Sequence, residues 1–585
     1  MIYPALVVGA ICASSTAAID PTSIAPAAID ARLSAVATAH GNSTRLETLA
    51  TSAGGHPIRI ITIGDPATIG KRLPTLLLVA GSDARHQTGI EVALRVAERF
   101  AASPPPWLAH ASISILPCLN PDGLARSGPA ADFGRLVIPT DADGDGRQIE
   151  DGGDDLDGDG MILAMRIKSP APSTGLNATL CTDPDFPQLM RAPDPAKGEL
   201  PVYAVLIEGL DNDGDGRFNE DGIAGSSGGG LDLDQQWPSF WPEFRDGSGR
   251  RPLQTDETLA LAAWCQAHPQ IASVVVFGRH ETLVSIPEAG KMDPSGQVPI
   301  GIEGDDKPVY ESISSKFKEI TGINESPGSD TAGSLISWAY TNLGVPAFAT
   351  PVWVRPDLVK EERRGITKPA GPDPSSTPDA KAPLTEAAPP TPPAKPRPEA
   401  KSDESKWLRY YEETKDQQGF VDWKPWKHPQ LGEVEIGGFV PGARMNAPAK
   451  ELPRLVEQQS EFLGDLASRF AVIEPRTWAT RLGPGLWKIE LRLTNTGKLP
   501  TRLAIGAKSR AKLPTIATLD VEPAKLMSGR KIVRAESIAA NGGVFDASWT
   551  VRADDGTSLK MQLTDPMMEP MELVVPLTAS TEAKP

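Results

Sequence analysis

Cysteine is scarce in this chain, with four residues among 585. One of them, Cys12, lies in an N-terminal segment that we expect to be removed, as described below. The other three are Cys118, Cys181 and Cys265, an odd and low number that allows one disulfide at most. A disulfide framework is therefore excluded, and the apolar share of 40% is enough for a fold held by a packed core.

Long apolar runs and basic surfaces are lacking as well. Beyond the N-terminus, no run approaches the roughly 18 apolar residues that a membrane-spanning helix needs. The formal net charge is −17, and no stretch suggests a face for nucleic acid. Most of the excess charge is local, because residues 141–160 and 211–221 together contribute −12. Such local acidity favours bound cations over a generally acidic surface.

The N-terminal segment MIYPALVVGAICASSTAAIDP contains a short apolar run that ends in small residues. This pattern predicts a secretory signal over residues 1–18, cleaved near Ala18, although the usual positive charges before the run are missing. The alternative is a disordered start. The prediction implies a secreted or periplasmic protein.

A chain of 585 residues is too long for one core, so more than one domain is expected. Residues 44–62 read as a hairpin around Gly-Gly. After it, buried apolar strands alternate with helical patterns, which is typical of a mostly parallel sheet with helices on both faces. The strands are expected at 76–80, 112–119, 273–278 and 345–353, and the helices at 89–102, 255–268, 333–344 and 452–470.

The predicted α/β domain spans residues 19–470, and a second domain follows it. Residues 361–405 are rich in Pro and cannot bury a core, so they are expected to form a disordered insertion. From about residue 473 the pattern changes to alternating runs separated by turns. Residues 473–580 are therefore predicted to form a small all-β sandwich that carries no catalytic constellation.

Two acidic loops, DADGDGRQIEDG (141–152) and DNDGDGRFNEDG (211–222), carry the D-x-[DN]-x-D-G core of a calcium loop. The predicted ligands are Asp141, Asp143 and Asp145 in one loop and Asp211, Asp213 and Asp215 in the other. Both loops have Gly where a calcium loop places its bidentate Glu. Closure would fall to Glu150 or Asp151, and to Asn219, Glu220 or Asp221. A partial third copy starts at Asp155, and a solvated acidic turn is the alternative.

The order of these elements and a series of short motifs resemble the zinc carboxypeptidase family, of the carboxypeptidase A type. The resemblance covers residues 44 to 470 without the Pro-rich insertion. It is carried by TSAGGHPI, by SILPCLNPDGLARSG with Asn120 to Gly123, by GLDLDQQWP (230–238), by RPLQTDETLAL and by GVPAFATPVW (344–353). It implies a mixed, mostly parallel sheet flanked by helices.

The resemblance also implies a zinc site, and here the sequence departs from the family. The family's His-Ala-Arg-Glu turn reads Asp83-Ala84-Arg85-His86, with carboxylate and imidazole exchanged. The third ligand position falls on Gly278, and His280 lies two residues later, about 6.6 Å further along an extended strand. A shortened loop would restore His280. Asp83, His86 and His280 are then a candidate two-His, one-carboxylate zinc set; otherwise they are ordinary polar residues at a cleft mouth.

The implied general base and substrate clamp depart as well. The position of the family's catalytic glutamate is Pro351, which has no proton acceptor on its side chain, and Glu281 is a weak substitute. The family's Asn-Arg clamp for the substrate carboxylate reads Asp234-Gln235, and Asp234 would repel that carboxylate.

Three hypotheses follow. The leading one is a degenerate peptidase domain that binds peptides, cell-wall fragments or a protein partner, with calcium in its loops. The rival is an active metallocarboxypeptidase with a rearranged zinc site. In the third, the α/β domain is a scaffold that displays the sandwich.

Overall fold

The computed structural model describes residues 24–578 except 128–133, 137–150, 220–229, 294, 297–298, 327–328, 360–397 and 416–418. The predicted signal segment, most of the Pro-rich insertion and the loop with Asp141, Asp143 and Asp145 therefore lie outside the described residues, and so does Asp221.

A six-stranded mixed sheet forms the centre of the molecule, with the order β1-β2-β4-β3-β9-β10. Its inner strands pair in parallel, and β1 and β2 add an antiparallel edge. The strands are β1 (Thr44–Thr51), β2 (Pro57–Ile63), β3 (Thr75–Ala80), β4 (Ser112–Leu116), β9 (Ile271–Phe277) and β10 (Ala347–Thr350). Every residue of β3 and β9 is buried, as expected for apolar runs covered on both faces. The predicted α/β fold class is confirmed.

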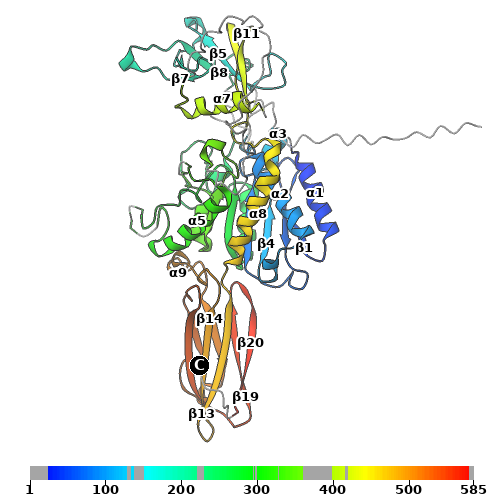
Figure 1. The fold of residues 1–585 in the computed structure, drawn as a ribbon, viewed down its shortest axis with the longest axis vertical. Coiled ribbons are helices and arrows are strands. Elements are labelled where there is room, and N and C mark those ends of the chain that lie inside the picture. The colour runs from blue at the N-terminus through cyan, green and yellow to red at the C-terminus, as the bar shows by residue number, and fades with distance from the viewer. Residues whose placement is uncertain are drawn as a thin grey trace, which may run out of the picture.

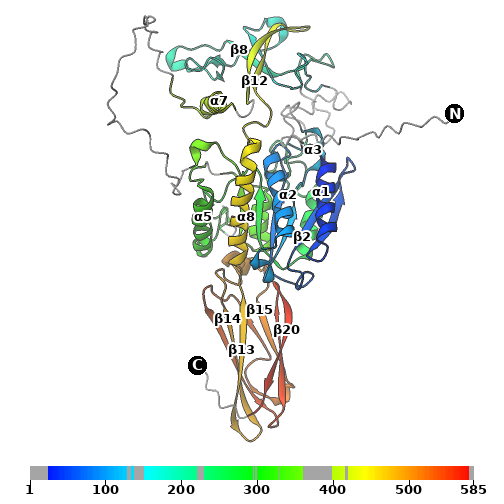
Figure 2. The ribbon, with the colours of Figure 1, turned by 45° about the vertical axis from the view of Figure 1, so that its right-hand side comes forward.

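Helices cover this sheet. On one face α2 (Gln87–Ala102) packs between α1 (Pro26–Ala39) and α8 (Leu452–Ser468), as Figures 1 and 2 show. α4 (Asp256–Ala267) contacts β1, and α5 (Lys307–Thr321) packs against α8. The short helix α3 (Pro121–Arg126) follows β4. The predicted helix at 333–344 is α6 (Leu335–Trp338), which continues as the π-helical turn Ala339–Leu343.

A second, antiparallel sheet lies beyond the carboxyl ends of the central strands, at the top of Figure 1. It has its own apolar core, which includes Met165 and Ile436. Its order is β11 (Phe420–His428), β12 (Gly432–Phe439), β5 (Ala164–Lys168) and β8 (Tyr203–Ile207). Helix α7 (Asp403–Thr414) lies beside it, so the predicted insertion 361–405 extends into the first turn of a helix. The sequence analysis did not foresee this sheet.

The C-terminal region consists of two four-stranded antiparallel sheets. In β14 the buried and half-buried residues alternate, and Trp487, Ile489 and Leu491 face the core. One sheet holds β13 (Ile473–Gly483), β14 (Leu486–Asn495), β16 (Leu526–Ser528) and β18 (Gly543–Arg552), and the other β15 (Thr515–Asp520), β17 (Ile532–Ala535), β19 (Ser558–Asp565) and β20 (Met568–Pro576). This confirms the predicted all-β component of the fold.

Cysteine and hydropathy also agree with expectation in the part of the chain that the structure describes. Cys118, Cys181 and Cys265 are buried free thiols. Among the described residues no helix has the length and apolar character to cross a bilayer.

The α/β domain and the sandwich meet in a tight joint at the amino ends of the central strands. The Asp306 carboxylate accepts the backbone N–H groups of Ala504 and Ile505, at 2.7 and 3.2 Å, at the start of α9 (Ala504–Lys508). Gly344 has φ +68°, and a Cβ there would lie 2.6 Å from the Cα of Gly506. Such contacts fix the orientation of the two domains.

The ammonium of Lys512 is buried in the same joint. It donates hydrogen bonds of 2.6 Å to the carbonyl oxygens of Pro269 and Ile271. Burial lowers the pKa of Lys512 from 10.5 to about 8.

Lys512→Met is expected to change how stability depends on pH. Between pH 8 and 10.5 the folded chain has released the Lys512 proton while the unfolded chain still holds it. The free energy of unfolding of the natural chain should therefore rise by up to about 3 kcal/mol across this window, relative to the variant. Urea unfolding at several pH values measures the difference. Lys531→Met, an exposed change in the sandwich, is the control, and a flat difference for Lys512→Met would contradict the expectation.

Candidate functional site

The predicted site residues lie at the carboxyl ends of the central strands, beside the 3-10 turn η4 (Leu233–Gln235). The turn between β3 and α2 carries Asp83 and His86, and His280 follows β9. All five predicted side chains are buried, with exposed fractions of 3% for Asp83, His86 and Asp234 and 8% for Gln235 and His280.

Asp83 is engaged by its neighbour Arg85. The guanidinium donates from Nη2 to Oδ2 at 2.7 Å and from Nε to Oδ1 at 3.0 Å, a two-point contact. Burial alone would raise the pKa of Asp83, but the hydrogen bonds and charge of Arg85 outweigh it and hold this pKa well below its ordinary range. Asp83 is therefore an ionised carboxylate that already has a cation.

His86 and His280 are neutral imidazoles with free ring nitrogens. Burial lowers the pKa of both side chains, so neither carries a charge at neutral pH. Nδ1 of His86 and Nε2 of His280 are buried and have no hydrogen-bond partner among the described residues.

The three candidate zinc ligands do not converge. In the described part of the chain, groups of three or more metal-ligating side chains with all ligand atoms within 4.8 Å occur in the acidic loops alone. A tetrahedral zinc ion with bonds of about 2.0–2.3 Å needs ligand atoms roughly 3–4 Å apart. A Cβ at Gly278 would lie 3.9 Å from Oγ of Ser82, so the family's third-ligand position has room for a side chain that the sequence lacks.

A second arginine, Arg279, organises the other carboxylates. Its Nη2 donates to Oδ2 of Asp232 at 2.6 Å, and its Nε lies 3.6 Å from Oδ2 of Asp234. Asp232 also accepts Nε2 of Gln235 at 2.7 Å. Burial alone would lower the pKa of Arg279, but Asp234, Asp232 and Asp83 raise it above its ordinary value. Three carboxylates and two guanidiniums thus share the crevice, with a net charge of −1.

The strand end that carries the family's base has an unusual backbone. Trp353 N donates to the carbonyl of Pro351 at 2.7 Å, and Val352 between them has φ +67°. A positive φ is unfavourable for a β-branched residue, so this three-residue turn is strained. Val352 is 1% exposed, which means that packing holds it there.

Glu281, the substitute base considered from sequence, is committed to the backbone. Its carboxylate accepts the N–H groups of Leu283, Val284 and Ser285, and the residue is 3% exposed. Burial raises its pKa. Glu281 closes the turn after β9, and this arrangement does not favour a role as general base.

Unpartnered polar atoms concentrate in this crevice. Buried polar groups in proteins are nearly always hydrogen-bonded, so such a concentration marks a place for water or a ligand. Within the segments 82–87, 234–237 and 278–280, the buried atoms without a hydrogen-bond partner among the described residues are Ser82 Oγ, His86 Nδ1, Gln87 Oε1, Asp234 Oδ2, Gln235 Oε1, Gln236 Oε1, Trp237 Nε1 and His280 Nε2. Acceptors with no donor prevail among them, which favours a ligand rich in hydrogen-bond donors.

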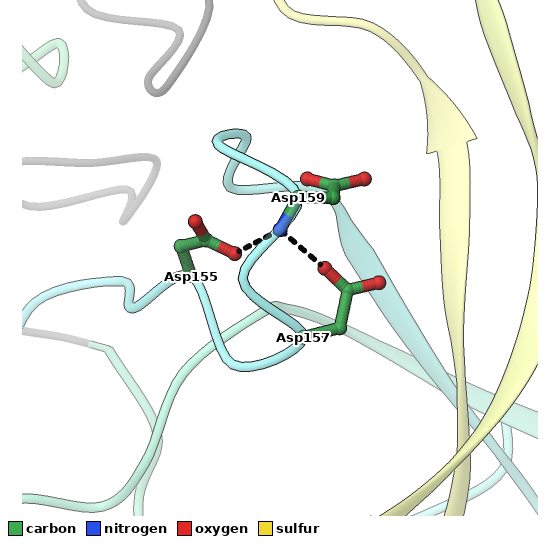
Figure 3. Close-up of side chains that lie close together, drawn as sticks. All are labelled: Asp155, Asp157 and Asp159. Atoms are coloured by element: carbon green, nitrogen blue, oxygen red, sulfur yellow. Dashed lines mark hydrogen bonds between the residues drawn. The ribbon is translucent and has the colours of Figure 1, made fainter.

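The acidic loops lie in the segments around the second sheet. In the partial copy, Asp159 N donates to carboxylates of both Asp155 and Asp157 at 3.1 Å, as Figure 3 shows. Asp155 also accepts Gly158 N at 2.8 Å and Gly160 N at 2.9 Å. The three carboxylates face a common point, with ligand atoms within 4.8 Å of one another.

The loop predicted at Asp211, Asp213 and Asp215 repeats this geometry. Asp211 accepts Gly214 N at 2.7 Å and Gly216 N at 3.1 Å, and Asp213 accepts Asp215 N at 3.0 Å. Its three carboxylates also lie within 4.8 Å of one another.

Buried acids connect the segment that holds Asp155, Asp157 and Asp159, here the first loop, with the loop of Asp211, Asp213 and Asp215, here the second loop. Asp151 accepts Asn212 N at 2.9 Å and Asn219 N at 2.6 Å, both from the second loop. Glu208, which precedes the second loop, accepts Leu156 N at 2.7 Å in the first. The predicted closing residue Asn219 is buried and directs its amide to the Ile207 carbonyl at 3.0 Å, and its Oδ1 has no partner.

Arg279 and Asp232 are residues of the candidate site that the sequence analysis missed, and it gave no role to Arg85. Arg279 follows a buried strand directly and precedes a predicted ligand. The sequence signal for this contact was the position of Arg279 after a buried strand, because a buried charge there needs a partner of opposite charge.

Comparisons with known proteins support the resemblance. The family model described as "Zinc carboxypeptidase" matches residues 29–148, which confirms the predicted resemblance, and "Domain of unknown function (DUF8731)" matches residues 475–573. A search of curated proteins finds no match.

Solved structures similar to this chain include carboxypeptidases. For carboxypeptidase A from Helicoverpa armigera the identity is 10%, covering 57% of this chain and 66% of that one, with a TM-score of 0.34. This chain thus spans just under two thirds of that enzyme's length. For thrombin activatable fibrinolysis inhibitor (TAFI) the identity is 11%, the match covers 57% of this chain and 70% of that one, and the TM-score is 0.32. For a metallo-carboxypeptidase from Burkholderia cenocepacia the identity is 20%, the match covers 18% of this chain and 28% of that one, and the TM-score is 0.16.

Replacing Arg279 by Met is expected to destabilise the fold strongly. Asp232 and Asp234, whose side chains are 5% and 3% exposed, would lose their cation. Breaking a buried pair in this way costs about 3–5 kcal/mol in the free energy of unfolding, measured with urea. Arg245→Met is the matched control, since Arg245 and its partner Asp330 are 48% and 61% exposed and the expected loss is below about 1 kcal/mol. Equal losses for the two variants would refute the assignment.

Proposed function

Because residues 29–148 belong to the zinc carboxypeptidase family, we propose that this chain keeps the family's fold as a binding module and has lost peptide hydrolysis. One observation carries the proposal: guanidinium groups already neutralise the carboxylates where the family implies a zinc ion. Asp83 is bonded to Arg85, and Asp232 to Arg279.

The family implies zinc, but the side chains of the crevice do not fit it. Asp83, His86 and His280 lack a common centre, and an incoming Zn²⁺ would have to displace Arg85 from Asp83. The base position is Pro351, and the carboxylate of Glu281 is occupied by backbone N–H groups. Neither a metal-bound water nor a base to deprotonate it is supplied by these residues.

The charge of the crevice favours a different ligand from the family's. Asp234 and Gln235 replace a clamp for a substrate carboxylate, and the cluster carries a net charge of −1. Its unpartnered atoms are mostly acceptors, as in Gln235 and Gln236. We therefore propose a peptide, cell-wall fragment or protein segment that presents an amino group or other donors to Asp234.

The chain should hold no stoichiometric zinc and should release no C-terminal residues from peptides. Metal analysis of the purified full chain and incubation with peptides that have free C-termini measure both. Fluorescence anisotropy with Lys-rich and Glu-rich peptides tests binding. Asp234→Asn should lower the affinity for the Lys-rich peptide about tenfold.

The rival function predicts the opposite results. An active metallocarboxypeptidase would hold one zinc per chain and would release terminal residues from peptides stepwise. Both the zinc and this activity would be lost in His86→Ala. Partner binding retained in full by a chain with Asp234→Asn and Arg279→Lys would favour the scaffold hypothesis.

We further propose that the acidic loops bind calcium and that the protein is secreted. Two loops repeat one hydrogen-bond pattern, and in each the three carboxylates face a common point. Oxygen clusters of this kind are the ligands that Ca²⁺ prefers. The apolar N-terminal run supports secretion, and millimolar calcium outside the cell would fill even weak sites.

Removal of calcium is expected to lower the stability of the chain. At a free concentration 100 times the Kd, each site contributes about 2.7 kcal/mol to the free energy of unfolding. Thermal unfolding in EGTA, then with added Ca²⁺ or Mg²⁺, measures the effect. The calcium-dependent shift should shrink in Asp211→Ala and in Asp155→Ala but persist in the exposed control Asp185→Asn. An identical melting temperature with and without Ca²⁺ would count against calcium.

A further inference from the structure

We propose that a cavity at the amino ends of the central strands binds an acidic monosaccharide, a sugar that carries one carboxylate or phosphate group. The cavity is open to solvent, has a volume of about 370 Å³ and lies between the sheet, the C-terminal end of α4 and the sandwich. It is at the opposite end of the central strands from the crevice described above, so the two sites are independent.

The floor of the cavity is a patch of hydroxyl groups on the sheet. Thr62 of β2 and Ser114 of β4 are paired across strands, and their hydroxyls are 2.8 Å apart. Thr75 of β3 and Ser112 of β4 form a second pair at 2.8 Å. The Thr75 hydroxyl also donates to the Leu73 carbonyl at 3.0 Å. Each hydroxyl has one donor and two acceptor positions, so these pairs keep acceptor positions for a ligand.

These hydroxyls break the apolar pattern of the sheet. The alternate residues of β2 and β4, such as Ile61, Ile113 and Ile115, point to the other face and are fully buried in the core. A sheet covered on both faces normally carries aliphatic residues on each. Packing alone therefore does not account for a polar floor.

Cations stand at the rim. Arg45 pairs with Thr62 across β1 and β2 and lines the cavity, while its Nη1 donates to the carbonyls of Gly41 and Thr44 at 3.0 and 2.7 Å. Lys71 and Arg72, in the loop before β3, are exposed, and neither side chain has a hydrogen-bond or ion-pair partner among the described residues. Glu47 and Glu569 are the acids of the lining, which leaves a net charge of +1 in a chain of net charge −17.

This lining fits a polyhydroxylated anion. The volume lies within the range of about 300–1,000 Å³ of small-molecule sites, but such sites are usually lined by apolar residues. Here hydroxyls, guanidiniums and carboxylates supply donors and acceptors for the hydroxyl groups of a sugar. The side chains of Lys71 and Arg72 supply the charge for a carboxylate or phosphate.

The sandwich closes one side of the cavity. The backbone N–H of Arg72 donates to Oε1 of Glu569, which belongs to β20, at 2.7 Å. A bound sugar would therefore contact both domains, and we expect it to raise the melting temperature of the whole chain.

Isothermal titration of the full chain tests the proposal with four probes: glucuronate, glucose 6-phosphate, glucose and inorganic phosphate. At least one acidic sugar should bind tenfold more tightly than glucose and phosphate, and the preferred acid distinguishes a carboxylate from a phosphate ligand. Arg72→Met and Lys71→Met should each weaken binding at least fivefold, and Thr62→Val at least tenfold. Lys531→Met, an exposed change in the sandwich, should have no effect.

Three results would overturn the proposal. The first is that neither acidic sugar binds at 10 mM. The second is that inorganic phosphate alone binds as tightly as the acidic sugars. The third is that the affinity for the acidic sugar is unchanged in Arg72→Met and Lys71→Met. Both rim residues are exposed, so these two variants are expected to fold.

Discussion

The contact between Arg279 and the acids Asp232 and Asp234 is the interaction on which the rest of the crevice depends. Removing a carboxylate from water costs several kcal/mol unless a cation accompanies it. In the zinc carboxypeptidase family a metal ion supplies that positive charge. Here two side chains of the chain itself supply it, one beside Asp83 and one between Asp232 and Asp234. The acidic residues after β3 and at the turn η4 therefore each have a guanidinium within reach.

This replacement explains why the other departures occur together. If no metal-bound water forms, as proposed above, a general base has no task, and Pro351 at its position is consistent with that proposal. The turn at Val352 with its positive φ and the cradle of N–H groups around Glu281 are compatible with a site held by packing and hydrogen bonds. Strain of this kind persists where the surroundings fix the backbone, and Val352 is fully enclosed.

The sequence predicted the parts of the fold that local patterns encode. Continuous apolar runs predicted β3 and β9, and helical periodicity predicted α2 and α8. The second sheet escaped because β5 and β12 pair across more than 250 residues of chain, and β11 is mostly exposed with a Pro in its centre. Motif positions located Asp83, His86 and Asp234. They did not reveal that Arg279 reaches Asp232, since the direction of a long side chain after a strand is set by tertiary contacts.

The two acidic regions differ in what neutralises them, and this difference indicates where a metal ion can still act. In the crevice, guanidiniums leave one uncompensated charge among three carboxylates. In the loop of Asp211, Asp213 and Asp215 the hydrogen-bond donors among the described residues are neutral backbone amides, and the guanidinium of Arg217 lies 3.7 Å from Asp215. Three carboxylates within 4.8 Å repel one another, and a divalent cation relieves that repulsion. If the loops bind calcium as proposed, the ion would relieve this repulsion and order the segments beside the second sheet.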